Sequence, residues 1–431
     1  MERAIGWNEG AIFAVDQRAL PHEHRILSFG DLEGLIQAIR QLAIRGAPAI
    51  GVAAGLGVAL SARRHIQGGA VDETAVRADA QRLIAARPTA INLKWAVDRV
   101  LGRLSEGPDA VLAEALSMLD EDERINRAAA HRAVELIRQL CPDRRLRILT
   151  HCNTGALATA GWGTALGAIR ELAEADRVES VLVNETRPLL QGARLTVWEL
   201  AEAGIAHRLC VDMAGAAAVA SGLVDCVIVG ADRVAANGDV ANKIGTYALA
   251  CAAEHRRVPF IVVAPESTID PATPGGATIV IEQRPAEEVT RMAGVPTTVA
   301  GTQVFNPAFD VTPNELVTAL VTESRRYPTR GAFGYRAGLP ADHGSAAVAV
   351  ADVTRSLYRR GWMEGTSGNV SVRLPGAQEL AVITASGGGK GELIAADTVP
   401  VAVTSGDPIG PSRLRPSAET AIHVALYRTF S

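Results

Sequence analysis

The chain has 431 residues, which is longer than one ordinary domain and predicts two or three domains. Apolar residues make up 48% and charged residues 21%, as in a globular protein with a buried core. The 43 Lys and Arg residues nearly balance the 47 Asp and Glu residues, so neither nucleic acid nor an anionic membrane is the expected partner. Five cysteines without a CxxC pattern, no long apolar run and a polar N-terminus predict a cytoplasmic protein without disulfides or structural zinc.

Residues 1–140 are predicted to form a mainly helical N-terminal domain. A short strand is expected at 11–17, and helices are expected at 31–45 and 110–139. Asp31 stands where it can cap the first of these helices. The apolar positions of that helix recur at helical spacing and are Leu32, Leu35, Ile36, Ile39 and Leu42.

Residues 141–326 alternate short β-branched runs with alanine-rich helical stretches. This alternation predicts an α/β fold with a Rossmann-like, doubly wound parallel sheet. The expected strands are 147–150, 178–183, 207–211, 226–230 and 258–264, and the expected helices are 155–175, 194–203, 213–223, 240–255 and 315–326.

The remaining chain is predicted to be a linker and a second kind of domain. Residues 327–343 contain several glycines and prolines, which indicates a linker or an extended arm. Residues 344–431 begin with a helix at 345–360, continue through short strands and glycine-rich turns, and finish with a helix at 418–427. We expect this last segment to be an incomplete α/β domain.

Candidate catalytic residues follow the predicted strands, because ligands of open parallel sheets bind beyond the carboxyl ends of the strands. Cys152 follows the first strand and precedes the predicted helix start at Thr154 and Gly155, where a helix N-terminus would stabilise a thiolate. The alternative is a small buried core cysteine. Asp232 follows the fourth strand and could be an acid or base, or else a helix cap or a partner of Arg233.

Two further groups are candidates for holding an anion. Asn242 and Lys243 are expected to open the helix that follows Asp232. In Arg45-Gly46-Ala47-Pro48, the glycine permits close approach of a ligand to the backbone and the arginine can hold a phosphate. The alternative for this segment is a simple turn with a solvated arginine.

Five long motifs, in order along residues 1–340, resemble those of methylthioribose-1-phosphate isomerases. They are RGAPAIGVAAG (45–55), LTHCNTGALATAGWGTALGAIR (149–170), NETRPLLQGARLTVWEL (184–200), GADRVAANGDVANKIGTYALA (230–250) and FNPAFDVTP (305–313). The resemblance implies conversion of 5-methylthioribose 1-phosphate to 5-methylthioribulose 1-phosphate in methionine salvage. It also implies a homodimer, a small sugar phosphate as the partner, and neither a metal nor a nucleotide cofactor.

The resemblance also assigns roles to individual residues. Asp232 matches the catalytic acid, and Cys152 matches the cysteine that acts as a base or stabilises the transition state. The matched substrate-binding residues are Arg45, Gly46, Ala47, Arg87, Gln191, Asn242 and Lys243.

The C-terminal segment resembles the first half of methylthioribulose-1-phosphate dehydratase, a member of the class II aldolase family. The matching stretches are TSGNVSVR (366–373), ITASGGGKGEL (383–393) and RPSAETAIHVALYR (415–428). The resemblance implies that Gly368, Asn369, Ser386 and Gly387 hold a substrate phosphate and that Glu419 is an acid or base.

Zinc is expected for a complete dehydratase domain, through a His-x-His pair and a later histidine that follow the glutamate. Here only His423 follows Gly344, so these ligands are absent from the sequence and dehydratase activity is not expected. The His-x-His pair at His22 and His24 is interpreted as surface residues without a metal.

Two other functions stay open at the level of the sequence. One is ribose-1,5-bisphosphate isomerase, and the other is a non-enzymatic relative of the regulatory subunits of the translation initiation guanine-nucleotide exchange factor. The intact set of Cys152, Asp232, Arg45 and Gln191 argues against the regulator. The long methylthioribose-type motifs argue against the bisphosphate enzyme.

Overall fold

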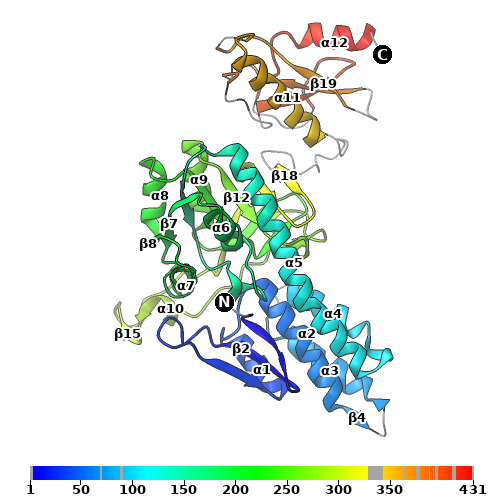
Figure 1. The fold of residues 1–431 in the computed structure, drawn as a ribbon, viewed down its shortest axis with the longest axis vertical. Helices are drawn as coiled ribbons and strands as arrows, with labels where there is room; N and C mark the ends of the chain where they lie inside the picture. Colours follow the sequence, from blue (N-terminus) through cyan, green and yellow to red (C-terminus); the bar gives the residue numbers. More distant parts are fainter. Residues whose placement is uncertain are drawn as a thin grey trace. The chain divides into compact units, whose positions relative to one another are not determined.

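The computed structural model describes residues 3–67, 70–87, 91–328, 343–363, 365–374, 379–387, 389–391, 393, 397–409 and 414–429. The chain divides into two compact units, Met1–Arg326 and Tyr327–Ser431 (Figure 1). The first unit spans the residues for which a helical domain and a Rossmann-like domain are expected. Among the described residues, no helix combines the length and the apolar character that a membrane crossing requires.

The first unit begins with a three-stranded antiparallel sheet and a group of helices (Figure 1). Its elements are β1 (Ile5–Asn8), β2 (Ala11–Val15), β3 (Ile26–Phe29), α1 (Leu32–Arg40), α2 (Ala47–Arg64), β4 (Ile66–Gln67), β5 (Ala70–Val71), α3 (Glu73–Ile84), α4 (Ile91–Leu101) and α5 (Pro108–Leu140). The Asp31 side chain caps α1 by accepting a hydrogen bond from the Gly34 N–H at 2.8 Å, which confirms the predicted helix start. Helix α2 is apolar on nearly all sides and packs against α3, α4 and α5, so it forms the centre of this helical core.

A seven-stranded sheet follows, in the order β18-β17-β12-β9-β6-β7-β8. Its strands are β6 (Leu146–Thr150), β7 (Val178–Asn184), β8 (His207–Cys210), β9 (Cys226–Val229), β12 (Phe260–Val263), β17 (Ala319–Val321) and β18 (Arg326–Pro328). Each strand from β17 to β8 runs parallel to its neighbours in that series. Strands β9 and β12 are buried at every position. Continuous apolar strands are typical of a parallel sheet that is covered on both faces.

The helices between these strands are α6 (Ala165–Glu174), α7 (Val197–Glu202), α8 (Asp212–Ala220) and α9 (Thr246–Arg256). Helix α6 and the second half of α5 share an apolar cluster with one face of the sheet. Helices α8 and α9 pack against each other and contact β7 and β9 (Figure 1). Short helical turns are present at Ala156–Ala158, Gly192–Thr196, Glu266–Thr268, Gly276–Thr278 and Asn314–Leu316; the turn at Gly192–Thr196 is a π-helix that leads into α7.

A four-stranded sheet accounts for one wrong prediction. Its order is β13-β10-β11-β16, and its strands are β10 (Arg233–Ala235), β11 (Val240–Lys243), β13 (Ile269–Asp270) and β16 (Phe309–Thr312). The expected helix at 240–255 therefore begins only at Thr246. Residues Val240 to Lys243 instead pair with β10 and β16, because this sheet buries their apolar side chains and satisfies their backbone hydrogen bonds.

Two more expected helices differ in the structure. The helix at 155–175 begins at Ala165, after a short turn at Ala156–Ala158. The closing helix at 315–326 is absent, because residues Ala319–Val321 form β17. β17 is buried and pairs with β12 in parallel, so tertiary packing overrides the helical spacing of this segment. The short helix α10 (Glu287–Thr290) and an exposed hairpin of β14 (Arg291–Met292) and β15 (Val295–Pro296) precede β17 in the chain.

The second unit is a three-stranded antiparallel sheet between two helices. Its elements are α11 (His343–Arg359), β19 (Ser371–Arg373), β20 (Leu380–Thr384), β21 (Thr398–Ala402) and α12 (Thr420–Thr429). Along β20 the side chains alternate: Val382 packs with α11, whereas Ala381 and Ile383 belong to a cluster that Tyr427 of α12 contacts. Both expected helices are confirmed, and residues 329–342 of the expected linker lie outside the described residues.

Candidate active site

Cys152 and Asp232 follow neighbouring strands of the parallel sheet. Cys152 comes two residues after the end of β6, and Asp232 comes three residues after the end of β9, which pairs with β6. The Cys152 backbone has a φ of 62°, an uncommon value for a non-glycine residue. It is held there by two hydrogen bonds: its N–H donates to Thr186 Oγ1 at 2.9 Å, and its carbonyl accepts from Thr196 Oγ1 at 2.6 Å. The sheet thus brings the two candidate catalytic residues to one edge.

The environment of Cys152 differs from the one expected from the sequence. Because α6 starts at Ala165, no helix N-terminus begins at Thr154. Burial raises the pKa of the Cys152 thiol, and Arg45 and Lys243 only partly oppose this effect. The expectation of a thiolate stabilised by a helix is therefore wrong, and the thiol form is favoured in the free protein.

Asp232 is surrounded by cationic groups, yet the pKa of its carboxyl lies above the ordinary value. Its backbone N–H donates to the Ala241 carbonyl at 2.9 Å, which fixes it beside β11. Burial raises the pKa of the Asp232 carboxyl, while Lys243, Arg45 and Arg87 lower it without cancelling the effect. Arg233, the alternative partner considered from the sequence, forms an ion pair with Asp270 at 3.5 Å. A raised pKa is the shift that a carboxyl group needs in order to act as a general acid.

Arg45 lies two residues before the start of α2 and donates its hydrogen bonds to neutral acceptors. Its Nε donates to Gln17 Oε1 at 2.9 Å, and its two Nη atoms donate to the carbonyl and the side-chain oxygen of Asn153. Gly46 has a φ of 98°, and a Cβ there would lie 2.4 Å from the Ala158 carbonyl oxygen, so only glycine fits. Ala47 is buried as the first residue of α2. Arg45 is therefore an ordered part of the site and not a solvated turn residue.

Asn242 and Lys243 form the end of β11, not the start of a helix. The antiparallel pairing of β11 with β10 places them next to the segment that carries Asp232. Lys243 Nζ lies 4.9 Å from the centre of the Phe309 ring, and Asn242 Nδ2 donates to Thr246 Oγ1 at 3.0 Å. The Lys243 ammonium group lies close enough to the Asp232 carboxyl for their charges to interact.

Arg87 and Gln191 complete the set that the sequence singled out. Arg87 forms an ion pair with Glu282 at 3.0 Å. Gln191 is buried just before the π-helix, and its Oε1 has no hydrogen-bond partner among the described residues. A buried oxygen without a donor is costly unless a ligand or water supplies one. Gln191 is thus a candidate acceptor for a substrate hydroxyl.

Sequence reasoning missed several residues around the site. Gln17 and Glu282 contact Arg45 and Arg87 directly but come from segments without a motif. His151 is fully buried, and its ring nitrogens lie 2.8 Å from the Ile244 carbonyl and 3.1 Å from Asn184 Nδ2. Glu199 is fully buried on α7. Its place inside the motif at 184–200 was the signal in the sequence that could have identified Glu199.

The second unit brings some of its expected residues together. Asn369 Nδ2 donates to the Glu419 carboxylate, and Thr384 Oγ1 donates to Asn369 Oδ1 at 3.3 Å. Gly368 and Gly387 have φ values of 87° and 82°, which marks two tight turns. The Ser386 N–H, in the second turn, donates to the Arg415 carbonyl at 2.9 Å.

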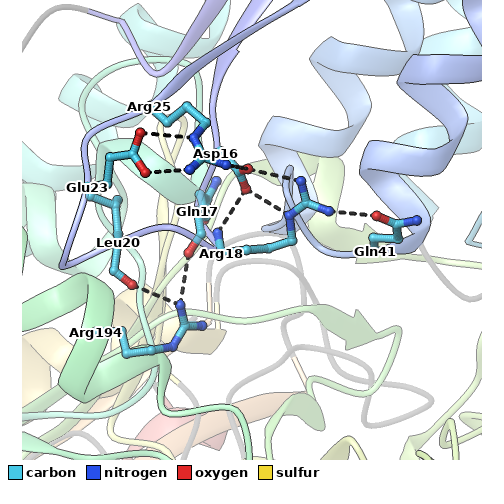
Figure 2. A network of polar contacts seen from close by, with 8 residues as sticks. All are labelled: Asp16, Gln17, Arg18, Leu20, Glu23, Arg25, Gln41 and Arg194. Carbon is cyan, nitrogen blue, oxygen red and sulfur yellow. Dashed lines mark hydrogen bonds and ion pairs between the residues drawn. The ribbon is translucent and has the colours of Figure 1, made fainter. Parts of the chain in front are cut away.

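The described residues do not fit a zinc site of the kind that a complete dehydratase domain would have. They contain no cluster of three His, Cys, Asp or Glu side chains that could hold a metal. His423 Nδ1 lies 2.8 Å from Ser371 Oγ. In the first unit, His22 is exposed, the ring centre of His24 lies 5.5 Å from that of Trp198, and Glu23 forms an ion pair with Arg25 (Figure 2).

Two family models match the chain. The Initiation factor 2 subunit family matches residues 43–325, and the Class II Aldolase and Adducin N-terminal domain matches residues 348–431. The first match covers more than half of the chain and includes every candidate residue of the parallel sheet.

Similar proteins come from bacteria and an archaeon. A probable bifunctional methylthioribose-1-phosphate isomerase/methylthioribulose-1-phosphate dehydratase of Nocardia farcinica is 58% identical over 99% of this chain and 75% of that protein. A methylthioribose-1-phosphate isomerase of Anaeromyxobacter sp. is 50% identical over 74% of this chain and 93% of that protein.

The crystal structure of 5-methylthioribose 1-phosphate isomerase from Pyrococcus horikoshii has a TM-score of 0.70 at 37% identity, covering 77% of this chain and 94% of that one. The α/β fold class is confirmed by this neighbour and by the aldolase match. The chain therefore belongs to the Initiation factor 2 subunit family, within its methylthioribose-1-phosphate isomerases, and continues into a class II aldolase segment.

Proposed function

We propose that the first unit converts 5-methylthioribose 1-phosphate to 5-methylthioribulose 1-phosphate, the reaction named for its relatives. The observation that carries the proposal is the pairing of Asp232 with Cys152 at one sheet edge, surrounded by cationic side chains. Burial raises the pKa of the Asp232 carboxyl despite three nearby cations. A sugar phosphate needs cations for its phosphate and an acid for its ring oxygen, and this edge supplies both.

Binding is assigned to the residues that surround the pair. Arg45, Arg87 and Lys243 supply positive charge for the phosphate dianion. Gly46 and Ala47 open α2, where the backbone N–H groups of the first turn have no helical partner and can bind an anion. Gln191 Oε1 and the Asn242 side chain supply polar contacts for sugar hydroxyls.

The reaction requires one bond to break and one hydrogen to move. The phosphate on C1 prevents simple opening of the sugar ring to a free aldehyde. Asp232 donates its proton to the ring oxygen as the C1–O bond breaks, so that oxygen becomes a hydroxyl. The hydrogen on C2 moves to C1, and the C2 hydroxyl releases its proton to water as it becomes the ketone. A proton taken up from water restores the Asp232 carboxyl, so no proton is gained or lost overall.

Cys152 lies close enough to Asp232 for their charges to interact. As a base it would take a proton at C2, and as a thiol it would stabilise the charge that develops as the ring opens. The raised pKa of Cys152 supports the second role, because a thiol that stays protonated is a poor base. Substrate labelled with deuterium at C2 separates the two: a hydride shift keeps the label at C1, whereas a proton removed by a base exchanges with water.

One assay tests the proposed function against its alternatives. The purified chain is incubated with 5-methylthioribose 1-phosphate or with ribose 1,5-bisphosphate, and the ketose carbonyl is followed by ¹³C NMR. The proposal expects a ketose from the first substrate and much slower turnover of the second. Turnover of ribose 1,5-bisphosphate alone would identify the chain as a bisphosphate isomerase. No turnover of either sugar would favour a non-enzymatic role like that of the regulatory subunits.

We also propose that the chain forms a homodimer through the β8 edge of its sheet. Strand β8 ends the sheet order, and three apolar side chains on and after it are at least half exposed: Leu209 at 50%, Val211 at 61% and Met213 at 75%. Exposed apolar side chains that gather at a sheet edge are typical of a protein interface. Sedimentation of the wild type and of Met213→Glu tests this: the variant should shift toward monomer.

A further inference from the structure

Arg45 is a partly buried cation that no carboxylate neutralises directly. Its guanidinium donates to Gln17 Oε1, to the Asn153 carbonyl and to Asn153 Oδ1, all of which are neutral acceptors. In the part of the chain that the structure describes, no Asp or Glu oxygen lies within ion-pair distance of it. Burial lowers the pKa of Arg45, an effect opposed by Cys152, Glu199 and Asp232. Its charge is therefore available to an incoming anion.

Glu199 is a buried carboxylate whose charge acts on Arg45. It is fully buried and accepts hydrogen bonds from Asn153 Nδ2 at 2.8 Å, from the Ala156 N–H at 2.8 Å and from the Leu157 N–H at 3.4 Å. Arg170 Nη2 donates to it at 3.0 Å. These hydrogen bonds fix the Glu199 carboxylate. Because Asn153 Nδ2 donates to that carboxylate, Asn153 Oδ1 faces Arg45.

The contacts close into a ring. Gln17 Nε2 donates to the Leu157 carbonyl at 2.7 Å, so the ring runs from Glu199 through Asn153, Arg45, Gln17 and Leu157 back to Glu199. Figure 2 shows the outer support of this ring: the Arg194 guanidinium donates to the backbone carbonyls of Gln17 and Leu20. A closed ring of hydrogen bonds orients each member more strictly than a single bond would.

We propose that Glu199, acting through Asn153, and Gln17 are positioning residues that hold Arg45 charged and unpaired for the phosphate of a phosphate monoester. A carboxylate bound directly to Arg45 would compete with that phosphate. A carboxylate one residue further away balances the charge of the empty site and leaves the guanidinium free. That the monoester is 5-methylthioribose 1-phosphate rests on the proposed function, whereas the contact between Arg45 and a phosphate group does not.

Isothermal titration of the full chain with inorganic phosphate tests the proposal without requiring turnover. Glu199→Gln removes the negative charge and places an amide N–H group against the N–H donors of Asn153, Ala156 and Arg170. The Kd for phosphate should therefore rise about tenfold. Glu202→Gln is the matched control, because Glu202 is exposed on the same helix. With substrate, Glu199→Gln should raise KM about tenfold and leave kcat within about threefold.

The same titration in an Arg45→Ala background separates positioning from general stability. If Glu199 acts through Arg45, Glu199→Gln should change the Kd less than about twofold in that background. Equal changes in both backgrounds, or an unchanged Kd in the single variant, would overturn the proposal, as would a wild type whose phosphate binding does not depend on Arg45. Gln17→Met, which should also raise the Kd, serves if Glu199→Gln does not fold. A wild type that binds phosphate through Arg45 but forms no ketose would overturn the proposed function alone.

Discussion

Replacing Asp232 with Asn tests the general acid with the least change in shape. The amide cannot release a proton to the ring oxygen, whereas Arg45, Arg87 and Lys243 stay in place to hold the phosphate. Loss of a positioned acid typically costs about 10²–10⁴ in rate, or about 2.7–5.5 kcal/mol of activation free energy. We therefore expect kcat to fall by that factor with KM within a few-fold of wild type, measured by NMR detection of the ketose.

The raised pKa of Asp232 adds a prediction about stability. A carboxyl whose pKa is higher in the folded than in the unfolded state costs stability as the pH rises from the unfolded pKa through the folded one. At neutral pH the Asn variant, which cannot ionise, should unfold at the same temperature as wild type or higher. Wild-type kcat should also fall as the pH rises through the raised pKa, because the acid loses its proton. A folded variant with near wild-type kcat would refute the assignment.

Five further predictions concern this site and residues 344–431. Cys152→Ser should lower kcat by about 10²–10⁴ while the far-UV spectrum stays unchanged; full activity would remove Cys152 from the mechanism. Arg45→Ala should act mainly through KM, because a charge-assisted bond to phosphate is worth about 1.5–3 kcal/mol, and unchanged KM and kcat would exclude Arg45 from the site. Isomerase activity should survive EDTA, since the proposed acid and thiol need no metal; loss that a divalent ion restores would contradict this. The 431-residue chain should not dehydrate methylthioribulose 1-phosphate with added zinc, and removal of residues 344–431 should leave isomerase kcat/KM within a few-fold. Water loss, or one tightly bound zinc per chain, would contradict the first expectation, and a large loss of isomerase activity would contradict the second.

The parallel sheet was predictable because its strands are short apolar runs that need no distant partner to be identified. The errors came where local pattern and tertiary pairing disagree. Val240–Lys243 continues smoothly into a helical stretch in the sequence, but β16, about 70 residues further on, pairs with it and makes it a strand. Ala319–Val321 has the apolar content of a helix face, but the open position beside β12 makes it a strand as well.

The site was predictable only as far as its motifs extend. Cys152 and Asp232 could be identified from their places after strands, but the environment of Cys152 depended on a helix start that lies ten residues later than predicted. Gln17 and Glu282 could not be found, because each meets its arginine across a long sequence separation. The charge state of a buried group depends on all the elements that pack around it, which a single motif does not specify.

The central claim is that the first unit isomerises a methylthioribose phosphate with Asp232 as the acid. The most direct measurement is ¹³C NMR of 5-methylthioribose 1-phosphate incubated with wild-type protein and, in parallel, with Asp232→Asn. We expect a C2 ketone signal that grows with the wild type and grows about 10²–10⁴ times more slowly with the folded variant. No ketone with wild type, or equal rates for the two proteins, would contradict it.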